Sequence, residues 1–192
     1  RSTNKLTLKG TTAASSNNSL NAVNLSTTST ITGNASTSSI NLIGEAKNLS
    51  GTSYDNAVNM TGTITGNAAN VNIQALYGKM SLDGTVTGAN ISIDNTGGTI
   101  SAATGTITAG TGTSSYTNAI NINKAITATG NINVLGNVAT ATNTGINLTA
   151  TTPIASSGAA ATINIASNGN IANAAAITAT GSTGTGANIN FT

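Results

Sequence analysis

Apolar and polar residues alternate along this chain in a short unit that returns many times. Each copy places one Asn or Ser between two apolar residues. Alternation with a period of two is typical of a β-strand with one buried face, and its return every few tens of residues is typical of a solenoid. The clearest copies are Val23–Leu25, Ile40–Leu42, Val58–Met60, Val71–Ile73, Ile91–Ile93, Ile120–Ile122, Ile132–Val134, Ile146–Leu148, Ile163–Ile165 and Ile189–Phe191.

A second unit, in which one aliphatic residue lies between two small residues, occurs between many of these copies. Its members are Thr30–Thr32, Thr63–Thr65, Thr85–Thr87, Thr106–Thr108, Ala125–Thr127 and Ala176–Thr178. The strand centres then form triplets: Val58, Ile64 and Val71; Met80, Val86 and Ile91; Ile120, Ile126 and Ile132. The first two triplets start 22 residues apart, and Ile100 and Ile120 continue the series at steps of 20. This spacing predicts a parallel β-helix with three short strands in each coil of about 20 residues.

The pattern covers the whole chain, which predicts a single β-solenoid domain over residues 1–192. At about 20 residues per coil the chain would form roughly nine or ten coils, in a rod on the order of 45 Å long. Within each strand the aliphatic side chains would point inward, so that outward Asn and Thr residues stack into ladders. The period is looser in four segments, which we interpret as outward loops: 10–20, 44–57, 109–117 and 179–187.

Composition supports a β-structure and argues against helices. Thr, Asn, Ser and Gly are poor helix formers, and no apolar stripe with helical spacing is present. Disorder usually accompanies high net charge, whereas this chain has a net charge of +2 and its β-branched residues recur in register. A set of β-sandwiches is the remaining alternative, but sandwiches usually contain aromatic core residues, and only 2% of this chain is aromatic.

The residues that usually carry catalysis or bind metals are scarce, so we expect no enzyme, no metal site and no cofactor. The chain has no His and no Cys, and its acids are Glu45, Asp55, Asp83 and Asp94. Asp83 and Asp94 are 11 residues apart, about half a coil, which places them on different sides of the predicted solenoid. Six scattered cations do not form the basic patch that nucleic-acid binding requires. No apolar run reaches the ~20 residues that would span a membrane.

Two segments, residues 63–73 and 125–134, resemble the shaft repeats of filamentous-haemagglutinin-type adhesins. These are large surface proteins of Gram-negative bacteria that are secreted by the two-partner route. The resemblance implies a right-handed parallel β-helix, an extracellular location at the bacterial cell surface, and roles in adhesion, biofilm formation or cell–cell contact. Some members carry N-linked glycans on Asn-x-Ser/Thr, and such triplets begin here at Asn17, Asn24, Asn34, Asn48, Asn59 and Asn147.

The leading functional hypothesis is a non-enzymatic structural and adhesive element of an extracellular bacterial fibre. The strand pattern of the chain continues to Phe191. This predicts that the chain is either an excerpt of a longer solenoid or a subunit that stacks into a fibre. The expected partners are other copies of the chain, associated end to end or side by side, or an adjoining solenoid of the same chain. Glycans of host or neighbouring cells are further candidates.

Two other functions remain open from the sequence. Stacked Thr-x-Thr pairs could form a flat ice-binding face from Thr30, Thr32, Thr63, Thr65, Thr85, Thr87, Thr106 and Thr108. A polysaccharide-active enzyme would need a groove that brings at least two of the four acids together. Tyr54, Tyr77 and Tyr116 are spaced close to one and two coils, and could line one flank that contacts sugars or a neighbouring fibre.

Overall fold

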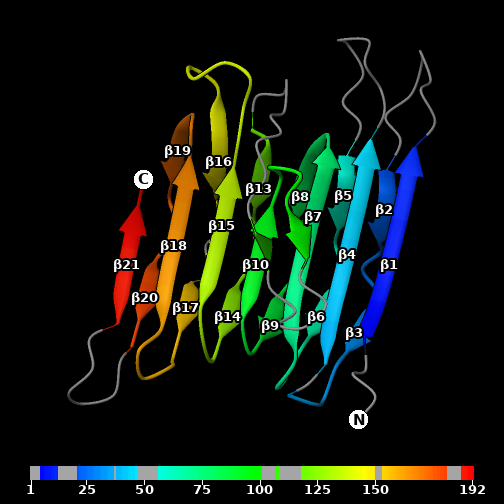
Figure 1. Ribbon diagram of the computed structural model, residues 1–192, viewed down its shortest axis with the longest axis vertical. Helices are drawn as coiled ribbons and strands as arrows, with labels where there is room; N and C mark the ends of the chain where they lie inside the picture. The colour runs from blue at the N-terminus through cyan, green and yellow to red at the C-terminus, as the bar shows by residue number, and fades with distance from the viewer. Residues whose placement is uncertain are drawn as a thin grey trace.

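A computed structural model shows that the chain folds as a right-handed parallel β-helix. The structure describes residues 5–12, 21–36, 38–46, 56–100, 107–108, 118–149, 153–180 and 187–192, and contains no helix among them. Three parallel sheets run along the solenoid, and the chain passes from sheet A to B to C in each coil (Figure 1). This confirms the predicted fold class, including its three strands per coil.

Sheet A is the front sheet in Figure 1 and has seven strands. They are β1 (Lys5–Thr12), β4 (Ser39–Ala46), β7 (Asn70–Tyr77), β10 (Ile91–Asp94), β15 (Ile132–Gly136), β18 (Thr162–Ser167) and β21 (Asn188–Phe191). Sheets B and C form the other two sides, with six strands each. Sheet B contains β2 (Asn21–Leu25), β5 (Asn56–Met60), β8 (Lys79–Leu82), β13 (Ile120–Ile122), β16 (Thr144–Leu148) and β19 (Asn170–Asn173). Sheet C contains β3 (Thr30–Thr32), β6 (Thr63–Thr65), β9 (Val86–Gly88), β14 (Ile126–Ala128), β17 (Ile154–Ser156) and β20 (Ile177–Ala179).

The register confirms the three predicted triplets of strand centres. In sheet B, Met80 pairs with Val58 and Ile120, and the middle members of the triplets pair in the same way in sheet C, as do the last members in sheet A. Side chains with the same role therefore stack directly on one another from coil to coil. The apolar residues form inward columns, and almost every member between the end coils is completely buried.

The number of coils differs from the prediction. The described strands form six coils with all three sheets, and β21 adds a seventh strand to sheet A. Within sheet A, only the step from β7 to β10 has the predicted 20 residues. The other steps in this sheet are longer, and their lengths include 31, 34 and 41 residues, because insertions lengthen the coils between strands. At about 4.8 Å per strand, sheet A is about 29 Å long, shorter than the 45 Å expected.

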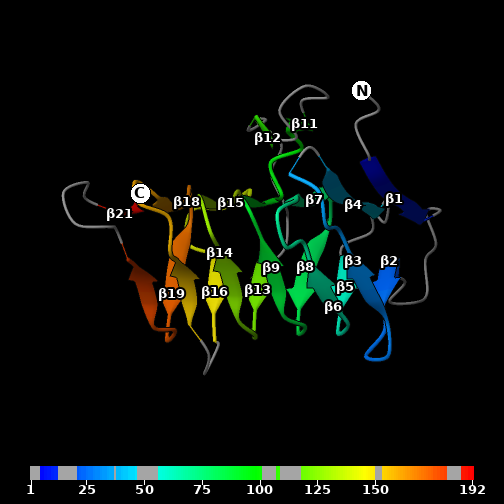
Figure 2. The ribbon, with the colours of Figure 1, turned by 90° about the horizontal axis from the view of Figure 1, so that it is seen from below.

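One strand assignment within the predicted series is wrong for the same reason. Ile100 does not follow Met80 in the stack, since Met80 pairs directly with Ile120. Ile100 belongs instead to β11 (Thr99–Ile100), which pairs antiparallel with β12 (Ile107–Thr108). This two-stranded ribbon lies outside the solenoid, over the outer side of sheet A (Figure 2).

The four predicted loops are tested only at their edges. Residues 13–20, 47–55, 109–117 and 181–186 lie outside the described residues. Residues 10–12 belong to β1, residues 44–46 to β4, residues 56–57 to β5 and residue 179 to β20, so the strands extend further than the looser sequence pattern indicated.

Glycine permits close backbone approach, both between successive coils and between neighbouring sheets of one coil. A Cβ atom on Gly84 would lie 1.7 Å from the carbonyl oxygen of Gly62, one coil below. On Gly44, it would lie 1.9 Å from the carbonyl oxygen of Ala57. Because both obstacles are backbone atoms, no side-chain rotation could relieve the overlap. Both positions therefore exclude a residue with a Cβ unless the backbone moves.

Candidate interaction faces and ends

The outer side of sheet C is a surface of threonine and other small residues, which we call the threonine face. In β3 and β6, Thr30 pairs with Thr63 and Thr32 with Thr65, while the Ile between them points inward. Its two columns, read from β3 to β20, contain Thr30, Thr63, Thr85, Ala125, Pro153 and Ala176 in one, and Thr32, Thr65, Thr87, Thr127, Ala155 and Thr178 in the other. Every one of these residues is exposed or half-exposed.

The structure therefore brings together six of the eight threonines that were singled out from the sequence. Thr106 lies outside the described residues, and Thr108 lies in β12, away from sheet C. Thr127 and Thr178 were not singled out from the sequence, but they occupy the same column as Thr65. Their signal was present in the units Ala125–Thr127 and Ala176–Thr178, whose second small residue is Thr in both.

The outer side of sheet B carries asparagines that hydrogen-bond to one another. Asn59 Nδ2 donates to Asn24 Oδ1 at 2.9 Å, and Asn147 Nδ2 donates to Asn121 Oδ1 at 3.0 Å. Ser81 stands between these two pairs and donates to Asp83 instead. The predicted asparagine ladder is thus confirmed, in two segments, and part of its amide capacity is used within the face itself.

The possible glycosylation sites occupy three kinds of position. Asn24, Asn59 and Asn147 lie on the outer side of sheet B. In Asn59 and Asn147, the side-chain nitrogen that would carry a glycan donates a hydrogen bond to the asparagine of the preceding coil. Asn34 lies in an exposed turn after β3 and accepts a hydrogen bond from Asn67. Asn17 and Asn48 are outside the described residues.

Part of the outer side of sheet A is buried, although its residues alternate like those of an exposed face. Asn41 is 0% exposed and Asn72 is 1% exposed, and Asn72 Nδ2 donates to Asn41 Oδ1 at 2.8 Å. Asn41 Nδ2 in turn donates to the Leu6 carbonyl, Thr7 Oγ1 and Ser39 Oγ. These amides therefore stabilise the stacking of the first three coils and are not available to a ligand.

Asp94 is the only carboxylate on that buried surface among the described residues, and it fixes the start of the segment that leads to β11. Its Oδ1 accepts from the Thr96 backbone at 2.9 Å and from Thr96 Oγ1, and its Oδ2 accepts from the Gly98 backbone at 3.1 Å. Gln74 Nε2 donates to the same Oδ2 and to the Gly98 carbonyl. Donors from three residues thus hold this fully buried side chain.

The remaining described acids are also engaged with their own neighbours. Asp83, at the corner after β8, accepts from Ser81 Oγ at 2.8 Å and from Asn123 Nδ2 at 2.6 Å. Glu45 accepts from Thr11 Oγ1. Asp83 follows a strand of sheet B and Asp94 ends a strand of sheet A, as the 11-residue spacing predicted. Asp55 is outside the described residues, and no group of three potential metal ligands occurs within them.

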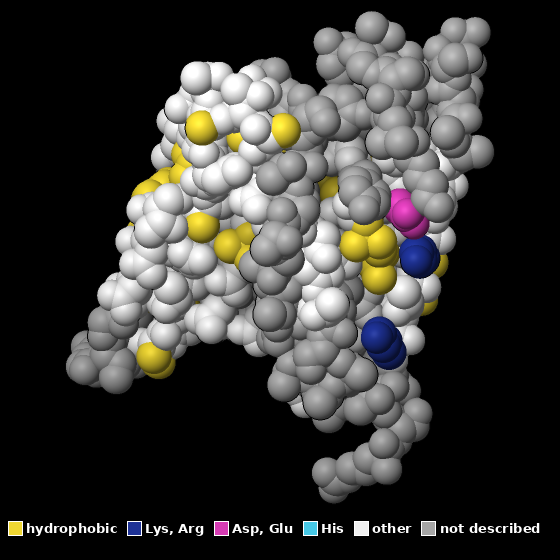
Figure 3. Space-filling view, turned by 45° about the horizontal axis from the view of Figure 1, so that its top comes forward, with side chains coloured by type: hydrophobic (Ala, Val, Ile, Leu, Met, Phe, Trp, Pro, Cys, Tyr) yellow, Lys and Arg dark blue, Asp and Glu magenta, His cyan; other side chains and the backbone are white. Residues whose placement is uncertain are grey.

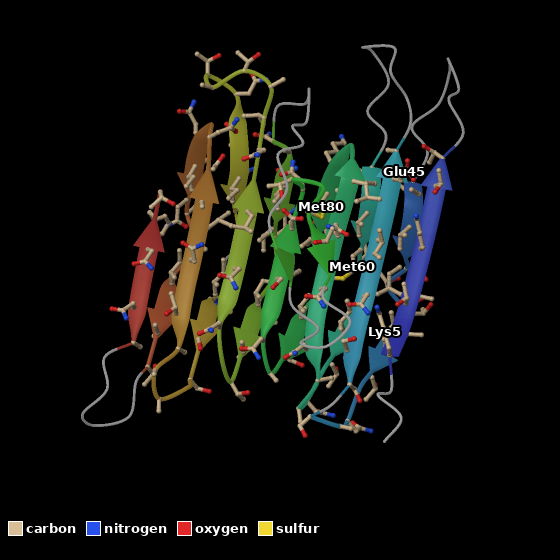
Figure 4. All side chains as sticks on the ribbon, viewed as in Figure 1. Lys5, Glu45, Met60 and Met80 are labelled. Carbon is tan, nitrogen blue, oxygen red and sulfur yellow. The ribbon has the colours of Figure 1, made fainter. Side chains whose placement is uncertain are left out.

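Charges are sparse on the described surface. In Figure 3, the charged side chains gather toward the end that contains β1, and most of the remaining described surface is uncharged. Lys5 begins β1 and Glu45 lies near the end of β4 (Figure 4). Lys79 begins β8, where partial burial lowers the pKa of its ammonium group. The described residues therefore present no dense field of either sign that would attract a charged partner.

The two ends of the solenoid expose residues that belong to the inward columns of sheet A. Leu6 and Leu8 in β1 are 41% and 39% exposed, and Ile189 and Phe191 in β21 are 40% and 47% exposed. Beside β21 lies an open groove of about 420 Å³, lined by Ser167, Gly169, Asn170, Ile171, Asn173, Phe191 and Thr192. Its lining includes residues of β19, the last strand of sheet B, and of β21, the last strand of sheet A.

The predicted tyrosine flank stays a prediction. Tyr54 and Tyr116 fall outside the described residues. For Tyr77, only the backbone is described, in β7 opposite Glu45.

The described residues form no helix that is long and apolar enough to cross a membrane. Comparisons of the chain with protein-family models, with curated proteins and with solved structures give no match in any of the three.

Proposed function

We propose that this chain is a non-enzymatic structural and adhesive element of an extracellular fibre at a bacterial cell surface. One observation carries the proposal: the apolar columns run through every coil and emerge at both ends with exposed members. Leu6 and Ile189 belong to one such column, and Leu8 and Phe191 to the next. An exposed strand with its apolar column uncovered favours the addition of a further strand.

The added coil would come from an adjoining solenoid of the same chain or from another copy. Either source lengthens the rod without changing its cross-section, because coil-to-coil contacts are repetitive. Sheet A offers the better surface for this contact at the β21 end, since in sheet B the inward column that contains Leu148 ends in Asn173. A rod of this kind holds its shape through nearest-neighbour contacts between coils, which suits a fibre that projects from a cell.

The sides of the rod support an adhesive role through many weak contacts. Uncharged amide groups repeat along the outer side of sheet B, so a partner with repeated polar groups, such as a surface glycan, could engage several rungs together. Repeated contacts of this type gain strength by multivalency. The resemblance to two-partner secreted adhesins gives the same expectation. Asp83 and Asp94 lie apart and accept hydrogen bonds from their own neighbours, which does not favour a role as a catalytic pair.

The test is electron microscopy and sedimentation of the purified chain, together with attachment of beads coated with it to bacterial cells. We expect concentration-dependent rods that are multiples of the coil stack, and more attachment than with uncoated beads. Replacing Leu8→Lys and Phe191→Lys should abolish the rods, because a charge would be buried at the contact. Thr178→Lys, which places the same charge on an exposed side of the rod, is the matched control and should still form rods. Rods that survive the end variants, together with beads that do not attach, would contradict the proposal.

A further inference from the structure

The threonine face is the most regular of the three outer surfaces among the described strands. All five strand pairings of sheet C keep a continuous register from β3 to β20. Pairings in sheets A and B contain register shifts, for example between Gly44 and Glu45 and between Asn56 and Val58. A sheet without such shifts keeps its outward side chains in straight columns, so the threonine face is an ordered two-dimensional array.

The array has a definite spacing and chemistry. Its rows are about 4.8 Å apart between strands, and its two columns are about 6.6 Å apart along each strand. Apart from Pro153, its outward positions carry hydroxyl and methyl groups, with neither a charged nor an aromatic residue among them. Each hydroxyl can donate once and accept twice, so even where Thr85 donates to Thr63 the pair keeps capacity for water.

These properties identify the kind of partner that fits. A charged side chain would have to shed its hydration shell on an uncharged solid, and the face carries no such side chain. Recognition of flat polysaccharides commonly uses aromatic rings, which the face also lacks. A rigid, neutral grid of hydroxyls and methyls is complementary to a neutral solid in which water oxygens repeat every few ångströms in two directions. We propose that the threonine face binds ice, an activity that goes beyond the structural and adhesive role.

Binding would be shared over the coils. Each coil adds two outward residues in the same register, so that many weak contacts form together once the first ones are made. The columns are richest in Thr from β3 to β9, where both contain only Thr. We therefore expect the first three coils to dominate the contact, with Thr127 and Thr178 extending one column beyond them.

The experiment measures thermal hysteresis and ice adsorption of the purified chain and of two variants on the face. Thr65→Tyr and Thr127→Tyr each place a bulky ring in the array, in different coils. We expect the unchanged chain to adsorb to ice and each variant to lose thermal hysteresis several-fold. The matched control is Asn59→Tyr, which adds the same ring to the outer side of sheet B in the coil that contains β6, and which should retain activity.

Circular dichroism and the melting temperature show that each variant is folded before it is compared. The proposal is overturned if the unchanged chain leaves ice untouched, or if it adsorbs to microcrystalline cellulose and not to ice. It is also overturned if the folded Asn59→Tyr control loses as much activity as the two face variants. Rod formation is measured separately, so a negative result on ice leaves the proposed structural role to be decided by its own test.

Discussion

At the scale of single residues, asparagines in equivalent positions of the alternating pattern differ in burial from one column to another. Asn72 and Asn24 both stand between two inward apolar residues, but Asn72 is buried and Asn24 is exposed. The alternating pattern gives the direction of each side chain and does not give its burial. Burial depends on what lies outside the sheet, which the alternation along a single strand does not specify.

This difference leads to a prediction for Asn72→Ala. The substitution removes the donor to Asn41 Oδ1 in a buried environment, so we expect a loss of about 1–3 kcal/mol in the free energy of unfolding. Asn24→Ala is the control, because Asn59 can replace its exposed partner by water, and the expected change is within about 0.5 kcal/mol. Urea denaturation of both variants measures the difference. Equal losses would show that the buried ladder adds nothing specific.

At the scale of strands and turns, the corners constrain the chain more tightly than the strands do. Gly84 has no room for a Cβ, whereas on Gly97 the nearest atom to an added Cβ is the Leu76 carbonyl oxygen at 3.9 Å. Gly97 has a φ of +70°, so an Ala there carries a conformational cost of about 1–2 kcal/mol. Gly84→Ala must instead separate two coils, and we expect a loss of about 3 kcal/mol or more. The melting temperatures of the two variants measure this difference. A larger loss of stability for the Gly97 variant than for Gly84→Ala would contradict the prediction.

Strand existence and register could be predicted from the sequence, but coil length could not. The alternation places Val71, Ile91 and Ile132 correctly in one column, because only inward aliphatics can fill the narrow core. Insertions between strands follow no such constraint. The segment that contains Ile100 and Ile107 has the composition of a solenoid strand, yet it pairs with itself outside the core. A local pattern cannot distinguish these cases, because the difference lies in which neighbour is available to pair.

The candidate site shows the same division. Six threonines of the face could be predicted from the Thr-x-Thr units. Once the strand register is correct, the two residues beside an inward aliphatic residue must point outward. The hydrogen bonds of Asp94 could not be predicted, because they depend on a turn through Thr96 to Gly98 and on Gln74 from the preceding coil. Contacts between coils 20 to 41 residues apart in sequence decide these details.

At the scale of the whole molecule, stability should vary along the rod. Coils in the middle have a neighbour on both sides, and residues such as Ile93 and Ile122 are 0% exposed. The described end strands β1 and β21 each have one neighbour in sheet A, and their apolar side chains are about two-fifths exposed or more. In a solenoid held by nearest-neighbour contacts, opening is therefore least costly at the ends.

Native-state hydrogen exchange followed by mass spectrometry can measure this gradient. We expect the amides of β7, β10 and β15 to exchange slowest and those of β1 and β21 to exchange fastest at low protein concentration. If further coils add to the exposed columns, raising the concentration should slow exchange at β1 and β21 and leave the central strands unchanged, because only the end amides gain new partners. The double variant Leu8→Lys with Phe191→Lys removes the apolar contact and should lose this concentration dependence. Uniform protection at every concentration would mean that the coils open as one unit, and the exposed apolar columns would then give no reason to expect growth at the ends.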